Sequence, residues 1–299
     1  MKRILLSTIT LIAFGFSSNA QNVNIPDVNF KAYLVGNTAI NTNADTEIQV
    51  SEASAFTGEI NCSGLGVADL TGIESFTSLT KLSCWGNSLT TIDVSQNTAL
   101  TFLWLESNSL TTLDITNNTL LTQLKIGQNQ FTSIDLTQNT LLDSLNCGQG
   151  MLNTLDVGQN SMLTFLNCSS NSISTLDISS NTSLIELYCY NNSLNELNIA
   201  NGNNTNIASS NFYATGNPDL TCIQVDDVAY STTNWTNIDA TSSFSLDCSS
   251  VGIEELSNTP KQLVKITDLI GRETTFKPNT PLIYIYSDGT AEKVFKLEE

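Results

Sequence analysis

The sequence predicts a mostly β solenoid in which short parallel strands stack coil upon coil. The main observation is a period of 21 residues, at which leucines recur six times. A second leucine follows each of them by three residues, and an asparagine usually follows five residues after that. Self-similarity at a fixed period of this size is typical of stacked repeats that share one core. The recurring leucines are Leu79, Leu100, Leu121, Leu142, Leu163 and Leu184.

Each repeat begins with a strand signal, for example Leu82-x-Cys84. Residues at alternate positions of a strand point to the same side, so this pattern predicts one buried face. We expect the next asparagine to close the strand by bonding the backbone of the turn, where asparagine also tolerates left-handed geometry. Gly150 replaces it once. The asparagines are Asn87, Asn108, Asn129, Asn171 and Asn192.

Each repeat also holds a second, similar half. In one coil this half reads Leu89-x-x-Ile92-Asp93-Val94-x-x-Asn97. Two near-equivalent halves predict two parallel strand ladders, one on each broad face. Asn, Thr and Ser disfavour helices, so we expect no helical layer within the array. The second asparagine recurs as Asn118, Asn139, Asn160 and Asn181.

Written once, the unit is L-x-x-L-x-[CLI]-x-x-N-x-L-x-x-[LI]-D-[VIL]-x-x-N-x-x. It resembles the leucine-rich repeat family, specifically the short bacterial repeats of internalin-like proteins. The resemblance covers residues 79 to 199, and a related 22-residue unit with Ile60, Cys62, Val67 and Leu70 precedes it. The resemblance implies a surface-presenting scaffold whose work is recognition, by adhesion or by binding of a protein or polysaccharide.

The composition restricts the function further. The chain has 29 acidic and 11 basic residues and no histidine, and residues 22 to 252 hold only three lysines. Without histidine, Ser-His or Cys-His nucleophilic catalysis cannot be assembled. An acidic surface repels nucleic acid and anionic membranes, and it suits a cationic partner or calcium. We therefore predict a non-enzyme, with a carboxylate-based glycan hydrolase or a passive surface-layer component as alternatives.

The chain divides into five predicted parts. Residues 1–20 form a secretory signal, because Lys2 and Arg3 precede an apolar run and small residues follow it. Residues 21–57 form an amino-terminal cap, in which a short helix is expected just after Asp27. The solenoid takes residues 58–204, a carboxyl-terminal cap takes 205–250, and a sorting domain takes 251–299. We expect no membrane span in the mature chain, and a monomer.

The last part is predicted to form three strands, at 263–267, 281–286 and 290–297, with a tight turn at Asp288-Gly289. It resembles the carboxyl-terminal sorting domain of the type IX secretion system of Bacteroidota. The resemblance implies that residues 255–299 address the chain to the secretion machinery, so that it is secreted or displayed on the outer cell surface. A small β cap without an address function is the alternative. The residues that carry the resemblance are 265–273, 277–286, 288–289 and 293–296.

Seven cysteines occur, and five of them share one position of the repeat. We interpret these five as small core residues, because parallel neighbouring strands suit a disulfide poorly. Cys222 and Cys248 lie outside the period and are predicted to form a disulfide that limits fraying of the solenoid end. The five core cysteines are Cys62, Cys84, Cys147, Cys168 and Cys189.

An aromatic stripe is the main candidate site. Large rings occupy outward strand positions in several coils, and exposed aromatic residues on a regular sheet often mark a binding face for protein or sugar rings. Ordinary packing between neighbouring strands is the alternative. The candidates are Trp85, Phe102, Trp104, Phe165, Tyr188 and Tyr190.

Two acidic features raise the question of calcium; no other cofactor is predicted. The loop Asn41, Asn43, Asp45, Glu47 and Glu52 resembles an EF-hand, although asparagine stands first and Thr46 replaces the usual glycine. A loop that orders the cap without metal is the alternative. One aspartate also recurs in every coil. Its charge would be offset either by bound cations or by hydrogen bonds, which could come from the Thr or Ser two residues before it or from turn amides. This acid ladder is Asp93, Asp114, Asp135, Asp156 and Asp177, with Asn198 ending the row.

Overall fold

The computed structural model of the chain describes residues 21–248, 262–287 and 290–295. The chain forms two compact units, Met1–Cys248 and Ser249–Glu299, which we treat separately. The predicted signal at residues 1–20 and the predicted turn at Asp288-Gly289 lie outside the described residues.

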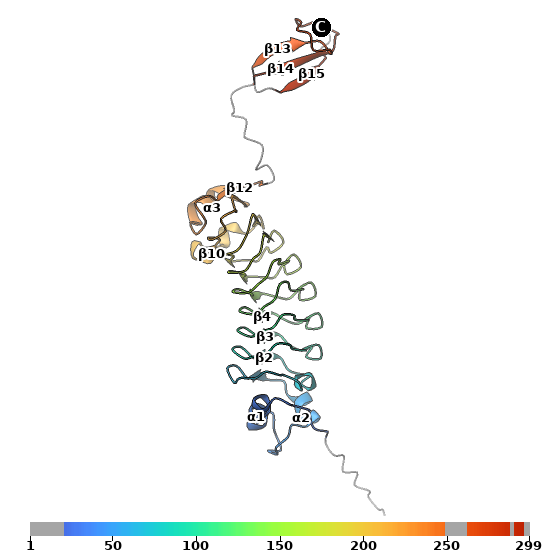
Figure 1. The fold of residues 1–299 in the computed structure, drawn as a ribbon, viewed down its shortest axis with the longest axis vertical. Coiled ribbons are helices and arrows are strands. Elements are labelled where there is room, and N and C mark those ends of the chain that lie inside the picture. The colour runs from blue at the N-terminus through green and yellow to red at the C-terminus, as the bar shows by residue number, and fades with distance from the viewer. Residues whose placement is uncertain (1–20, 249–261, 288–289, 296–299) are drawn as a thin grey trace, which may run out of the picture. The chain divides into compact units, whose positions relative to one another are not determined.

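The first unit is a stack of coils with one long parallel sheet along it (Figure 1). Equivalent residues of successive coils are paired in register, so that Leu82 lies opposite Leu103 and Leu103 opposite Leu124. The sheet has eight strands in the order β1 (Glu59–Asn61), β2 (Lys81–Ser83), β3 (Phe102–Trp104), β4 (Gln123–Lys125), β5 (Ser144–Asn146), β6 (Phe165–Asn167), β8 (Glu186–Tyr188) and β10 (Phe212–Tyr213).

The recurring leucines fill one continuous core. Leu103, Leu124 and Leu145 are fully buried and belong to a single cluster that runs from Val23 to Trp235. Each buried leucine contributes about 2 kcal/mol of hydrophobic stabilisation. Because most of that burial is against the neighbouring coil, the coils stabilise one another, as the period predicts.

The second ladder is shorter than the sequence predicts. It has four parallel strands and forms only in the last coils, where Leu176 and Leu197 point fully into the core. In earlier coils the equivalent positions form no strand, whether the residue there is half-buried, as Ile92 and Leu113 are, or buried, as Leu155 is. The four strands are β7 (Thr175–Asp177), β9 (Glu196–Asn198), β11 (Cys222–Gln224) and β12 (Ser243–Ser245).

Two columns of asparagine join neighbouring coils. In the first asparagine column (Asn87, Asn108, Asn129, Asn171, Asn192 and Asn217), Nδ2 donates to two or more backbone carbonyls and Oδ1 accepts an amide of the preceding coil. In the second column (Asn97, Asn118, Asn139, Asn160 and Asn181), Nδ2 likewise donates to two carbonyls of the preceding coil. Asparagines therefore do bond the turn, as predicted.

The asparagines of the first column do not themselves take up the left-handed conformation. The residue before each member of the first column does so instead: Gly86 has φ 67°, Ser107 has φ 55° and Gln128 has φ 54°. The asparagine side chain has to point inward to reach its partners, so the reversal of the chain falls on the preceding residue.

The amino-terminal cap contains the predicted helix, α1 (Val28–Gly36), followed by α2 (Val50–Ala55). Asp27 caps α1, because its Oδ1 accepts the amides of Asn29 and Phe30 at 2.9 Å. Its Oδ2 accepts the amides of Ala68 and Asp69 from the first coil. One carboxylate therefore joins the cap to the solenoid. A 3-10 turn, η1 (Ile73–Ser75), ends this first coil.

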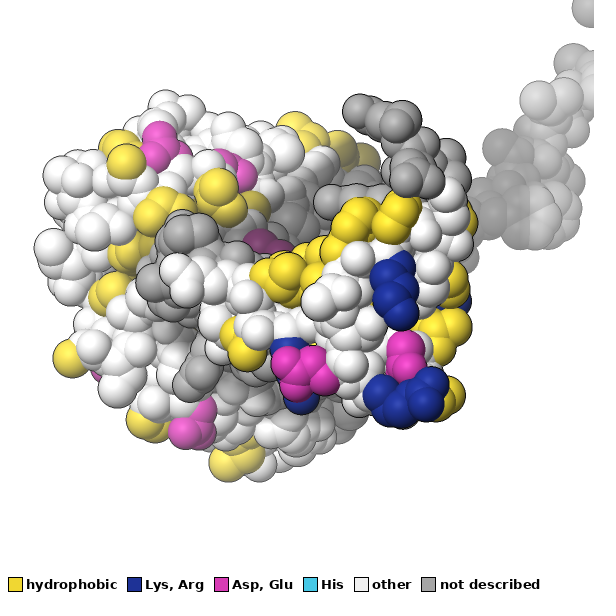
Figure 2. Space-filling view, turned by 90° about the horizontal axis from the view of Figure 1, so that it is seen from above, with side chains coloured by type: hydrophobic (Ala, Val, Ile, Leu, Met, Phe, Trp, Pro, Cys, Tyr) yellow, Lys and Arg dark blue, Asp and Glu magenta, His cyan; other side chains and the backbone are white. Residues whose placement is uncertain are grey.

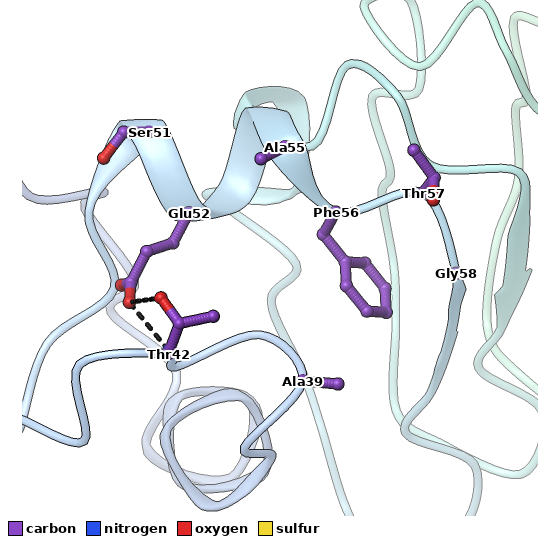
Figure 3. A pocket seen from close by; sticks show the side chains of 8 residues that line it. All are labelled: Ala39, Thr42, Ser51, Glu52, Ala55, Phe56, Thr57 and Gly58. Atoms are coloured by element: carbon purple, nitrogen blue, oxygen red, sulfur yellow. Dashed lines mark hydrogen bonds between the residues drawn. The ribbon is translucent and has the colours of Figure 1, made fainter.

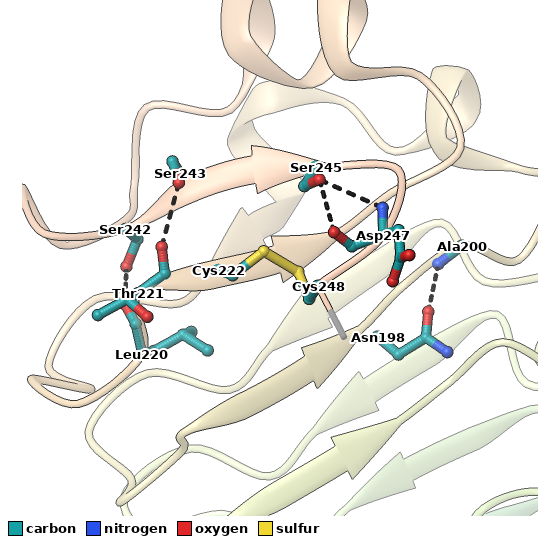
Figure 4. Close-up of a disulfide and its surroundings, with 10 residues drawn as sticks. All are labelled: Asn198, Ala200, Leu220, Thr221, Cys222, Ser242, Ser243, Ser245, Asp247 and Cys248. Atoms are coloured by element: carbon teal, nitrogen blue, oxygen red, sulfur yellow. Dashed lines mark hydrogen bonds between the residues drawn. A yellow bond between two sulfur atoms is a disulfide. The ribbon is translucent and has the colours of Figure 1, made fainter. Parts of the chain in front are cut away.

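Residues 204–248 continue both ladders through β10, β11 and β12 and add η2 (Asn204–Asn206), η3 (Ser209–Asn211) and α3 (Val228–Asn234). Trp235 after α3 is buried and stacks on Phe212 with the ring centroids 4.4 Å apart. The predicted disulfide between Cys222 and Cys248 is present and ties β11 to the chain after β12 (Figure 4).

The second unit is a three-stranded antiparallel sheet of β13 (Leu263–Thr267), β14 (Leu282–Tyr286) and β15 (Ala291–Val294). The three strands lie where the sequence predicts them. In the part of the chain that the structure describes, none of the helices has the length and apolar character needed to cross a membrane.

Candidate recognition face

Aromatic side chains gather on the outward side of the eight-stranded sheet, which we call the ring face. At its amino-terminal end the rings of Trp85 and Trp104 stack 5.6 Å apart, and Phe102 meets Trp104 edge-on at 6.4 Å. Trp85 follows β2 and remains 43% exposed. We call these three residues the tryptophan cluster.

Residues of both neighbouring coils contact the Trp104 ring. Trp85 stacks on the side of β2, and Lys125 from β4 places its Nζ 4.8 Å from the ring centroid. The ring Nε1 donates to Glu106, whose other oxygen accepts from Asn146 Nδ2 at 2.6 Å. These contacts hold the ring upright on the sheet.

A second group of rings lies further along the same face. Tyr188 stacks on Tyr213 at 5.5 Å, and Phe165 lies 5.9 Å from Tyr188 in a tilted arrangement. Burial raises the pKa of Tyr188, and the neighbouring carboxylate of Glu186 raises it further, so the hydroxyl stays protonated at neutral pH. We call these three residues the tyrosine cluster.

The two clusters are separated by polar strand positions. Gln123 on β4, Ser144 and Asn146 on β5, and Asn167 on β6 lie between them. Because β3 and β6 are three strand spacings apart, the separation is about 14 Å. The ring face therefore presents two apolar sites with a hydrogen-bonding strip between them.

The two clusters contain five of the six residues of the predicted stripe. The sixth, Tyr190, is half-buried like Tyr188 and makes no ring contact within the described part of the chain. Tyr213 and Lys125 were missed. A signal for Tyr213 exists, because residues 211–217 repeat the pattern of 186–192 after 25 residues instead of 21.

The loop at residues 41–52 is held by its own side chains. Glu52 accepts the amide and hydroxyl of Thr42 and the amides of Asn43 and Gln49. Burial raises the pKa of Glu52, but these hydrogen bonds outweigh it and hold the pKa below its usual range.

Most of the other predicted ligands of this loop are also engaged, although the buried Oδ1 of Asn41 accepts no hydrogen bond from the described residues. Asp45 accepts the amide of Glu47 at 2.7 Å and side-chain amides of Asn43 and Gln49, and these bonds lower its pKa. Glu47 is paired with Lys31 at 2.7 Å, and Asn41 donates to backbone carbonyls. Among the described residues, no group of three or more Cys, Asp or Glu side chains is placed to hold a metal ion.

The acid ladder is a row of turn caps. Each aspartate accepts the amide two residues after it, as Asp114 does from Thr116 at 3.0 Å. The hydrogen-bond donors to these aspartates are thus turn amides, together with the hydroxyls of Thr116 and Thr137. They are not the Thr or Ser residues two positions before each aspartate. The hydroxyl and amide of Thr116 lower the pKa of Asp114, so the carboxylate is stabilised without a cation.

A hollow of about 510 Å³ opens in the amino-terminal cap beside α2 (Figure 3). Its only ionisable side chain is Glu52, which Thr42 already holds. Glycoside hydrolysis requires two carboxyl groups roughly 5–10 Å apart across a cleft. The hollow therefore gives no support to the hydrolase alternative.

The charge is unevenly spread over the chain. Figure 2 shows acidic side chains scattered over a surface that is mostly uncharged. Residues 22 to 252 hold 21 acidic residues and only Lys31, Lys81 and Lys125. Two of these lysines, Lys81 and Lys125, lie on strands of the ring face.

Comparisons with known proteins agree with this architecture. No protein-family model matches the chain. Over 73 residues the chain is 40% identical to internalin J of Listeria monocytogenes; the match takes 24% of this chain and only 8% of the length of that relative.

Among solved structures, internalin C2 of the same species superposes with a TM-score of 0.54 at 17% identity, over 76% of this chain and 98% of the other. The functional domain of internalin J, described as including a cysteine ladder, gives a TM-score of 0.30 at 22% identity, over 93% and 98% of the two chains. The first likeness shows the fold, which is a leucine-rich-repeat solenoid.

Proposed function

We propose that the chain is a non-catalytic recognition scaffold, secreted or displayed at the cell surface, and that its ring face binds a protein. The observation that carries the proposal is the pair of aromatic clusters on one regular sheet. Large aromatic side chains held by a rigid scaffold lose little entropy on binding and are common energetic centres of interfaces. The internalin comparisons agree with a scaffold of this kind.

The ring geometry favours a protein over a polysaccharide. Sugar rings are bound by stacking on an open aromatic face, whereas the Trp104 ring is already contacted by Trp85 and Lys125. Tyr188 is likewise covered by Tyr213 and approached by Phe165. Rings that stand upright offer edges and crevices, into which apolar side chains of a protein insert. The acidic surroundings suit a partner with a basic rim.

The proposal is tested by probing an array of extracellular proteins and a glycan array with the mature chain. We expect protein ligands to be retained, and the double variant Trp85→Ala/Trp104→Ala to weaken their binding at least about tenfold, since central aromatic truncations cost about 2 kcal/mol or more. Met151→Ala is the matched control, because Met151 is exposed but lies outside the ring face. Equal binding by a folded double variant, or glycan binding alone, contradicts the proposal.

We further propose that the second unit is the address for type IX secretion. The support is its separate three-stranded sheet, its strand positions and its basic residues Lys265, Arg272, Lys277 and Lys293. Residues 249–299 fused to a periplasmic reporter should carry it to the surface or medium of a bacterium that has this machinery. A reporter that stays in the periplasm with residues 249–299 intact would exclude the address, but would leave the ring face untouched.

A further inference from the structure

The first two coils bring two buried thiols unusually close. Cys62 and Cys84 follow β1 and β2, whose strands pair in register, and their Sγ atoms are 2.8 Å apart. Non-bonded heavy atoms prefer separations of about 3.5–4.0 Å. Both side chains are fully buried and both thiols are free in this structure. The pair is therefore compressed, and a movement of roughly 0.8 Å would bring the two sulfurs to bonding distance.

Two of the other three core cysteines have different partners, although they occupy the same position of the repeat. The thiol of Cys147 points at the carbonyl of Asn167 at 3.4 Å, and that of Cys189 at the carbonyl of Tyr213 at 3.5 Å. The partners of these two thiols are thus backbone oxygens of the next coil, whereas the thiols of Cys62 and Cys84 contact each other.

We propose that Cys62 and Cys84 form a second structural disulfide, which staples the first two coils of the solenoid. The two thiols each lose a proton and an electron, the sulfurs join, and the disulfide of an oxidant such as oxidised glutathione or a thiol oxidoreductase is reduced to two thiols. The disulfide between Cys222 and Cys248 is of the kind that forms in an oxidising compartment.

The bond forms during folding. Thiolate is the attacking species in disulfide exchange, and burial raises the pKa of Cys84 well above its usual range. Once the core has closed, neither sulfur is exposed to an oxidant. The cross-link would join the first coil, which the amino-terminal cap contacts through Asp27, to the coil that follows it. A cross-link then lies at each end of the stack.

The test counts the free thiols of the full-length mature protein, refolded with oxidised glutathione until Cys222–Cys248 has formed. The protein is denatured without reductant, alkylated, digested and analysed by mass spectrometry. We expect label on Cys147, Cys168 and Cys189 only, and a peptide pair joined through Cys62 and Cys84. Label on Cys62 and Cys84 in this material overturns the proposal.

Two variants give an independent reading. Cys84→Ala should add label at Cys62, so that four thiols react instead of three, whereas Cys168→Ala should leave two. Amide hydrogen exchange of β1 and β2 in the wild type should accelerate at least about tenfold on reduction of the protein, if the cross-link restrains the first coil. Exchange there that is unchanged by complete reduction contradicts the role as a staple.

Discussion

Replacing Asn118 tests whether the second asparagine column holds the coils together. Asn118 is fully buried, and its Nδ2 donates to the carbonyls of Val94 at 3.0 Å and Asn97 at 2.9 Å in the preceding coil. Its Oδ1 is also buried and accepts no hydrogen bond from the described residues. The amide is thus used as a donor only, so alanine removes both hydrogen bonds at any pH, and aspartate removes both only when it is ionised.

The expected loss of stability depends on the hydrogen bonds that the carbonyls of Val94 and Asn97 keep when the side chain of Asn118 is removed. Asn97 N still donates to Val94 O at 2.9 Å, and Leu100 N still donates to Asn97 O at 3.1 Å. Asn118→Ala therefore removes two second bonds at about 1 kcal/mol each and leaves a small cavity, for a total of about 2–3 kcal/mol. For a chain of this size we expect the melting temperature to fall by about 5–10 °C.

Asn118→Asp should cost more and should depend on pH. At neutral pH it places a carboxylate against two carbonyl oxygens in the core, so burial and repulsion raise its pKa in the folded protein. The neutral acid can still donate one hydrogen bond. The defect should therefore be smallest below the unfolded pKa of about 3.9 and grow as the pH rises through the window up to the raised folded pKa.

The assay is a set of circular dichroism melts of the mature chain across this pH range. Asn117→Asp is the matched control, because it adds the same charge one residue away at an exposed position and should change stability by about 0.5 kcal/mol or less. If Asn118→Asp and Asn117→Asp melt alike at neutral pH, or if the Asn118→Asp defect does not grow with pH, the column is not what joins the coils.

Three further predictions use the same melts. Ser170→Gly should stabilise the folded protein by about 0.5–1 kcal/mol, because Ser170 has a left-handed backbone with φ 55°. Ser172→Gly should not stabilise it. Equal changes in melting temperature for the two variants would refute the backbone strain at Ser170. Asp27→Ala should cost about 1–2 kcal/mol. Burial raises the pKa of Asp27, but its hydrogen bonds from backbone amides lower it by more. The stability difference between the wild type and Asp27→Ala should therefore shrink as the pH falls below about 3.9, and a difference that stays constant would refute this. Calcium at about 1 mM and a chelator should give superimposable curves, and a calcium-dependent rise would mean that the acid ladder or the loop binds it.

The parts of the fold that depend on period and alternation could be predicted from the sequence. A leucine that returns every 21 residues has to face the same interior, because any other placement exposes the whole set to water. The same reasoning located β13, β14 and β15, where apolar alternation stops at turn residues. Cys222 and Cys248 could be paired because they alone leave the repeat.

The extent of the second ladder could not be predicted, because both halves of a coil have the same pattern of residue types. Burial of the inward side chain does not separate the two cases either, because Leu176 is 2% exposed within a strand and Leu155 is 7% exposed where no strand forms. The tyrosine cluster was incomplete for another reason, since the four extra residues before Phe212 hide Tyr213 from a fixed-period search.

The left-handed turn shows how the two kinds of constraint differ. The first asparagine column keeps its residue in every coil from Asn87 to Asn217 except at Gly150, whereas the residue before it varies among Gly, Ser, Gln and Asn. A left-handed conformation costs a residue other than glycine about 1 kcal/mol. This cost is small enough that the position does not require one particular residue type. The asparagine, however, satisfies buried carbonyls and an amide at once, as Asn129 does for Leu105, Ile126 and Leu110. The repeat therefore conserves the asparagine, whose side chain makes the hydrogen bonds, and lets the residue before it vary. The position with the strained backbone is for that reason the one that a sequence pattern cannot reveal.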